Sequence, residues 1–279
     1  MTDRAGPYKR DYNTTSYVHP MDENLNNLYK AMEYSANGEP QFRVSESVPF
    51  NLQVALGQVT GVSGLSISGY NASVGTEYVP LWDSAATYSY FGAAAVVRVW
   101  SSSGSDTNVS VTVTGLDANY LPISETVTLT NGATGVLTTK QFLRVNGANL
   151  TRTPMNVGVI SVGSSDKGTL LTTIEAGAGR SQMTIYTVPA GYTFYLTQSN
   201  WYTNQTGSQT ALYRSWTRSS SGLINIVLTF PMVQIYHSLK VVPRPYTEKT
   251  DIQWQAASSS GSSRIGGQIE GYLIQNSAI

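Results

Sequence analysis

Apolar residues alternate with polar ones along most of the chain, from about residue 46 to the C-terminus. Val109, Val111 and Val113, for example, alternate with serine and threonine. A period of two gives a strand one buried face and one hydroxylated face. Turn residues such as Asn131-Gly132 separate the segments about every 8–12 residues, a spacing typical of sandwiches. The pattern predicts an all-β protein with two antiparallel β-sandwich or jelly-roll-like domains.

The segment Ala176–Gly179 is rich in glycine and lies between two sets of predicted strands. We interpret it as a linker, because it lacks the residue pattern of a phosphate-binding loop. The expected organisation is an N-terminal arm and helix at residues 1–45, a first β domain at 46–180 and a second β domain at 181–279. Residues 1–20 have no period, so they form either a disordered terminus or an arm that orders on a partner.

Residues 22–36 have the period of a helix. Leu25, Leu28, Tyr29 and Met32 fall at i, i+3, i+4 and i+7 and share one face. A lone helix of this length is marginal in water, so this face must pack on something. We expect residues 1–45 to anchor the chain to a partner through these four side chains. The alternative is that the helix covers an open sheet face of its own chain.

The chain has 279 residues, and its 17 basic and 17 acidic residues give a formal net charge of zero. Nucleic-acid binding needs a basic surplus, so we expect none. Only 12% of residues are charged and tyrosine outnumbers phenylalanine by 18 to 6, which favours self-association. Cysteine is absent, which excludes disulfides and thiol chemistry. No apolar run of about 20 residues or signal peptide is present, so we expect no membrane insertion and synthesis in a cytoplasm.

Candidate catalytic groups have simpler explanations. His237 is in phase with Ile235 and Leu239, so we expect a hydrogen-bonded core or interface histidine rather than a catalytic base. Asp106, Asp117 and Glu125 could supply a carboxylate pair, and the two aspartates could supply calcium ligands. Turns and strand starts explain all three. We therefore expect no enzyme activity, no cofactor and no metal.

Aromatic residues offer a second possibility. Exposed rings beside asparagine and glutamine can stack on sugars, and four residues are candidates for such a glycan site: Trp201, Tyr202, Tyr213 and Trp216. The alternative is that these rings fill a core or a subunit interface.

Several phrases, in order, carry a resemblance that covers roughly residues 30–275. They are Glu33–Pro40 with Arg43-Val44, Gly69–Asn71, Pro80–Asp83, Ser101–Thr107, Gly115–Leu129, Phe142–Val145, Tyr186–Gly191 and Lys249–Ile252. The set resembles β-rich virion structural proteins of tailed phages, particularly those of marine and cyanobacterial podovirus type.

The resemblance implies a non-enzymatic virion component, made in the host cytoplasm and located in the particle. A capsid decoration or head-fibre protein is favoured over a tail component, and a carbohydrate- or receptor-binding β module is the rival class. The implied partners are further copies of the chain, with a trimer expected, other capsid or tail proteins, and a host surface glycan.

Overall fold

The computed structural model describes residues 32–34, 40–42, 48–84, 87–151, 154–205, 210–232, 234–259 and 262–278. Over these residues it is almost entirely β, and every strand pair is antiparallel, which confirms the predicted fold class. The helices in this part of the chain are α2 (Phe50–Ala55) and the short 3-10 helix η1 (Asn276–Ala278). Neither has the length and apolar character needed to cross a membrane.

Seven strands form what we call the inserted sandwich. One sheet has the order β11-β10-β5-β8 and the other has the order β7-β6-β9. Buried valines of both sheets meet in one core, so the sheets pack face to face. The strands are β5 (Ala95–Ser101), β6 (Ser110–Leu116), β7 (Pro122–Thr128), β8 (Val136–Phe142), β9 (Arg144–Leu150), β10 (Ile160–Ser164) and β11 (Leu170–Ile174).

The remaining strands of the unit Val54–Ile279 form what we call the main sandwich. Its sheets have the orders β16-β13-β18-β3 and β12-β17-β14-β15, and β4 pairs with β17. Its core is built from large rings, including Phe194, Trp201 and Trp254. The strands are β3 (Val62–Val74), β4 (Val79–Pro80), β12 (Ile185–Thr187), β13 (Tyr192–Thr203), β14 (Ala211–Arg218), β15 (Ile224–Met232), β16 (Ile235–Tyr246), β17 (Asp251–Ser258) and β18 (Ser263–Gln275).

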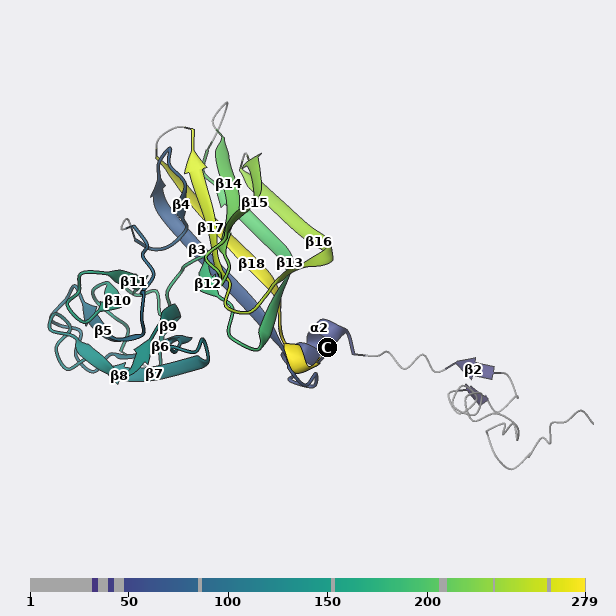
Figure 1. Ribbon diagram of the computed structural model, residues 1–279, viewed down its shortest axis with the longest axis horizontal. Helices are drawn as coiled ribbons and strands as arrows, with labels where there is room; N and C mark the ends of the chain where they lie inside the picture. Colours follow the sequence, from purple (N-terminus) through teal and green to yellow (C-terminus); the bar gives the residue numbers. More distant parts are fainter. Residues whose placement is uncertain are drawn as a thin grey trace, which may run out of the picture. The chain divides into compact units, whose positions relative to one another are not determined.

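Strand pairing differs from the predicted domain division at one place. The sequence assigns β3 and β4 to the first β domain, but β3 pairs with β18 and β4 pairs with β17. Figure 1 shows the dark blue β3 beside the yellow β18. The main sandwich is therefore discontinuous in sequence, and residues 95–174 are inserted between β4 and β12.

The helix predicted over residues 22–36 needs a correction where the structure describes it. Met32–Tyr34 form strand β1, which pairs with β2 (Pro40–Phe42) as a small hairpin outside the unit Val54–Ile279. Residues 22–31 and 35–36 lie outside the described residues. Helix α2 was not expected from the sequence.

Candidate functional sites

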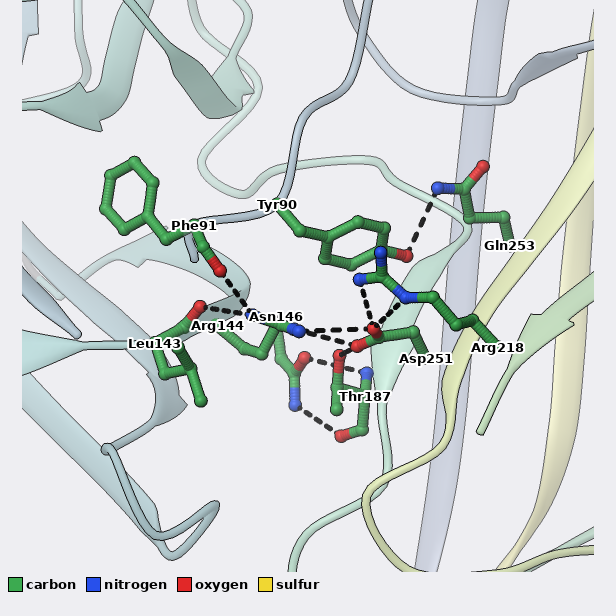
Figure 2. A network of polar contacts seen from close by, with 9 residues as sticks. All are labelled: Tyr90, Phe91, Leu143, Arg144, Asn146, Thr187, Arg218, Asp251 and Gln253. Carbon is green, nitrogen blue, oxygen red and sulfur yellow. Dashed lines mark hydrogen bonds and ion pairs between the residues drawn. The ribbon is translucent and has the colours of Figure 1, made fainter. Parts of the chain in front are cut away.

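A buried carboxylate at the start of β17 joins the two sandwiches. Asp251 Oδ1 accepts a hydrogen bond from Arg144 Nε at 2.8 Å, and Asp251 Oδ2 accepts one from Arg218 Nη2 at 2.6 Å. Arg144 begins β9 of the inserted sandwich, whereas Arg218 ends β14 of the main sandwich. Thr187 Oγ1 donates a third bond to Asp251 at 2.6 Å. We call this Arg144–Asp251–Arg218 arrangement, shown in Figure 2, the arginine clamp.

Other contacts fix the clamp in place. Arg144 Nη1 donates to the carbonyl oxygens of Phe91 and Leu143 at 3.0 and 2.9 Å. Both guanidinium carbons lie over the Tyr90 ring, at 4.8 Å for Arg144 and 4.4 Å for Arg218. Burial lowers the pKa of Arg144, but the hydrogen bond and charge of Asp251 outweigh it and raise the pKa overall. Arg144 therefore stays charged, and the clamp holds two positive charges against one negative charge.

A hollow of about 600 Å³ lies beside the clamp. Its lining includes Tyr90, Tyr120, both arginines and the turn residues Ser219 and Ser220. The side chain of Arg218 is 31% exposed, whereas that of Arg144 is 7% exposed, so Arg218 is the more open of the two. Because Asp251 already binds both guanidinium groups, the arrangement is explained as a joint between the sandwiches.

Two strand edges of the main sandwich expose apolar side chains. Strands β15 and β16 end their sheets and do not pair with each other within the described residues. Val241 is 95% exposed and Val242 is 80% exposed, in a part of β16 that bulges because residues 240–243 face only Thr197. We call the following set the apolar edge: Leu223, Ile224, Ile226, Leu239, Val241 and Val242.

The start of β15 and the last residues of β16 approach each other at one end of the sandwich. Ile226 of β15 and Arg244 and Pro245 of β16 line one hollow of about 450 Å³. The edges of the two sheets therefore approach here without closing. Large exposed apolar patches are a feature of interaction sites, so these side chains make the edge a candidate for one.

The four predicted aromatic residues do not form one site. Trp201 and Tyr213 are 1% and 2% exposed, and their ring centroids lie 3.9 Å apart in the main core. Neither ring is open to a sugar, so the core alternative describes these two. Trp216 lies on the outer face of β14, where Tyr90 stacks on it at a centroid distance of 6.4 Å. Tyr202 lies on the outer face of the other sheet and is 49% exposed.

The sequence predicts that Ile235, His237 and Leu239 share a buried face of their strand, and the structure corrects this prediction. Ile235 and Leu239 are 64% and 75% exposed, whereas the intervening Tyr236 packs against the core. The apolar face of β16 therefore points outward. His237 is exposed as well, and its Nδ1 lies 2.9 Å from Asn200 Oδ1.

The three candidate carboxylates accept structural hydrogen bonds. Asp106 is buried and accepts from Ser101 Oγ and from the backbone N–H groups of Val157 and Gly158. Burial raises its pKa, but these hydrogen bonds outweigh that effect and lower it overall. Asp117 accepts from the N–H groups of its own turn, and Glu125 accepts from β8. Within the described residues, no group of histidine, aspartate or glutamate is placed to hold a metal.

Three of the predicted anchoring residues, Leu25, Leu28 and Tyr29, lie outside the described residues. The fourth, Met32, is in β1 opposite Phe42. The proposed anchor therefore stays a prediction.

The arginine clamp and the bulge of β16 were not predicted from the sequence. Arg144 and Asp251 are 107 residues apart, and no local pattern links them. The Val241-Val242-Pro243 segment carried a signal, because two adjacent apolar residues followed by proline interrupt a period of two.

No protein-family model and no curated protein matches the chain. Among solved structures, the chain is similar to the VP2 subviral particle of infectious bursal disease virus, with 12% identity, 82% of this chain and 78% of that chain covered, and a TM-score of 0.20. A structure of the Gt strain of that virus has 13% identity, coverages of 81% and 77%, and a TM-score of 0.17. At such TM-scores the two folds do not superpose, so these matches carry no argument about function.

Proposed function

We propose that this protein is a non-enzymatic structural component of a tailed-phage particle and that it works as a homo-oligomer. The observation that carries the self-association is the apolar edge of β15 and β16. The placement in a phage virion rests on the ordered sequence phrases that resemble β-rich virion proteins. A capsid decoration or head-fibre protein is favoured, and a tail component is the alternative.

A second copy of the chain is the occupant that suits the apolar edge. Both edge strands present unpaired backbone groups, which a strand of any chain can accept. The edge is aliphatic, and Lys240, the nearest charged side chain on the bulge, donates to Ser238 at 2.6 Å. Arg244, just after the bulge, adds a second positive charge, so a contact between copies must bury the aliphatic residues and leave Lys240 and Arg244 at its margin. Symmetric contact between copies buries the same residues on each of them, and a trimer is the state that the resemblance implies.

The absence of catalysis is part of the proposal. It is supported by the use of Asp106, Asp117 and Glu125 as acceptors for backbone N–H groups, which leaves these three carboxylates engaged in turns and strand contacts.

The test of self-association is the mass of the purified full chain in solution. We expect multi-angle light scattering at tens of micromolar to give an oligomer for the parent chain. The double variant Val241→Asp/Val242→Asp places two charges on the bulge and is expected to be monomeric with an unchanged circular dichroism spectrum. Val157, which is 67% exposed in a loop of the inserted sandwich, provides the matched control Val157→Asp, which should remain oligomeric. A monomeric parent chain would remove the proposed contact.

The virion role has its own test. Mass spectrometry and antibody labelling of purified phage particles should detect the chain at a fixed ratio to the major capsid protein. Labelling of the head supports a decoration or head fibre, and labelling of the tail supports the alternative. Consistent absence from particles contradicts the proposal even if the chain is an oligomer.

A further inference from the structure

A shallow hollow of about 320 Å³ lies on the outer face of the sheet β16-β13-β18-β3. Its volume is at the lower end of ligand-binding pockets, which suits a short ligand segment. It lies at the N-terminal end of β16, beside Ile235 and His237, whereas the Val241-Val242 bulge lies near the middle of that strand. The contact proposed for the apolar edge therefore leaves room for a separate role of this hollow, which we call the tyrosine hollow.

Tyr202 forms the aromatic part of the tyrosine hollow. It pairs with Gly266 across β13 and β18, and a Cβ placed on Gly266 would lie 2.2 Å from the Tyr202 ring. The ring therefore lies across the backbone of Gly266, with about half of its surface in solvent. The next glycine, Gly267, makes the matching space for Trp201 on the buried side. The Gly266-Gly267 pair thus lets two adjacent aromatic residues lie against opposite faces of β18.

A row of neutral polar side chains lies beside this ring. Strand register aligns four residues across the four strands of the sheet: His237, Asn200, Gln268 and Ser68. Within the described residues, no hydrogen bond is made by Asn200 Nδ2, His237 Nε2 or Gln268 Oε1. The row therefore offers both donors and acceptors at the open side of the hollow.

The charged groups near the row include no positive surplus. Arg180 Nη2 donates to Ser68 Oγ at 3.2 Å, and Glu270 Oε1 accepts from Gln268 Nε2 at 2.6 Å. Asp83 lies near enough to Tyr202 to contribute to its raised pKa, after the larger effect of burial, so the margin does not favour an anion. A ligand rich in hydroxyl groups suits such a row, since each hydroxyl both donates and accepts.

We propose that the tyrosine hollow binds a neutral pyranose unit of a glycan, with the apolar face of the sugar on the Tyr202 ring and its hydroxyl groups on Asn200 and Gln268. An isolated ring of this kind gives weak binding, with a Kd on the order of 1 mM for one sugar. Several copies on an oligomer or particle would raise the effective affinity. The site does not depend on self-association, so it stands or falls apart from the proposed function.

Saturation-transfer NMR on the full chain tests the site with methyl glycosides of glucose, galactose and mannose, and with N-acetylglucosamine as probes. We expect at least one of them to bind, and Tyr202→Ala to weaken that binding by about tenfold or more. Tyr202→Phe keeps the ring and should stay within about threefold of the parent. Tyr195 lies on the same strand and face but outside the hollow, so Tyr195→Ala is the matched control and should bind as the parent does.

The outcomes separate the alternatives. Binding that persists in the monomeric Val241→Asp/Val242→Asp variant shows that the hollow acts within one chain. Failure of every neutral sugar to bind the correctly folded parent overturns the proposal. Binding that Tyr202→Ala leaves unchanged also overturns it. Loss of sugar binding in Arg218→Gln but not in Tyr202→Ala would place the ligand at the arginine clamp and contradict the proposed site.

Discussion

Two pairs of sheet edges, one in each sandwich, meet in different ways. In the inserted sandwich, Glu125 of β7 accepts hydrogen bonds from the edge N–H groups of Thr139 and Lys140 in β8, at 2.8 and 2.7 Å. Lys140 Nζ returns a bond to the Ser124 carbonyl at 2.7 Å. In the main sandwich, β15 and β16 leave a hollow of about 450 Å³ between them. Polar side chains close the contact between β7 and β8, whereas β15 and β16 stay apart at a hollow with a mostly polar lining, and both strands expose apolar side chains nearby.

The two cores help to explain this difference. The inserted core is mostly valine, with Phe142 as its one aromatic member among the buried residues described, and its strands have at most 7 residues. The main core is built around large rings, and β16 has 12 residues. Short strands leave short edges that one side chain can cover, whereas a long edge needs a partner strand. We therefore expect the main sandwich, rather than the inserted one, to contact other molecules.

The arginine clamp decides whether the two sandwiches act as one unit, and it gives the largest expected effect. Asp251→Ala leaves two guanidinium groups without their carboxylate, at a cost of about 3–5 kcal/mol in the free energy of unfolding. Differential scanning calorimetry should show one transition for the parent and a strongly lowered melting temperature for the variant. Two separate transitions in the parent would contradict the idea that the clamp couples the sandwiches. Asp117→Asn, which removes a carboxylate charge in an exposed turn but keeps the acceptor oxygen, is the control.

A second change acts inside the main sandwich alone. In Gly267→Ala the new Cβ would lie 2.0 Å from the Trp201 ring, so the ring must move. Overpacking of this kind costs about 1–3 kcal/mol. Gly64→Ala, on the neighbouring strand β3, meets no atom within 4 Å and should leave stability nearly unchanged. Urea unfolding followed by tryptophan fluorescence measures both variants, and equal stability of the two would show that the Trp201 packing is not tight.

A third change removes the polar contact between the edge strands β7 and β8. Glu125→Ala removes the acceptor for the β8 N–H groups, and we expect a loss of about 1 kcal/mol. Burial raises the pKa of Glu125, but the bonds from Thr139 and Lys140 outweigh it and lower the pKa overall. A lowered pKa stabilises the fold above the unfolded value of 4.5, and this contribution is lost as the pH falls through the folded value. The difference between parent and variant should therefore shrink in acid urea titrations. A constant difference from pH 7 down to pH 3 would contradict the assigned role.

The sequence predicted some of these features and not others. The alternation at Val109, Val111 and Val113 correctly placed a strand with one buried face, because local period and local structure are directly linked. The same alternation at Ile235 and Leu239 gave the strand but not the direction of its apolar face. A period shows which residues share a face, and only tertiary contacts decide which face is covered.

Local sequence patterns could not predict contacts between strands that are far apart in the chain. The pairing of β3 with β18 joins residues such as Ile67 and Ile269, which no turn signal connects. Tyr202 was identified as a candidate for sugar stacking, but its neighbours Asn200 and Gln268 come from two strands whose register the sequence does not show. The sequence also left open whether Trp201 and Tyr213 lie in the core, because their burial depends on long-range strand pairing that a local pattern does not show.

The smallest expected effect concerns the segment between β4 and β5, which joins the two sandwiches. Burial raises the pKa of Asp83 to about 7, with a further contribution from Glu175 and an opposing one from a backbone hydrogen bond of Gln182. Asp83 ionises near 3.8 in the unfolded chain, so the fold is favoured below that pH and loses this stability as the pH rises to about 7.

Asp83→Asn removes this charge and should raise the melting temperature at pH 8 but change it little at pH 4. The group is partly open to solvent, so the gain is on the order of 1 kcal/mol, or about 2–4 °C, rather than the full difference in pKa. Asp117→Asn keeps the acceptor that its turn needs and serves as the control. If Asp83→Asn were equally stabilising at both pH values, the effect would come from packing, and the joint between the sandwiches would not be the pH-sensitive part of the molecule.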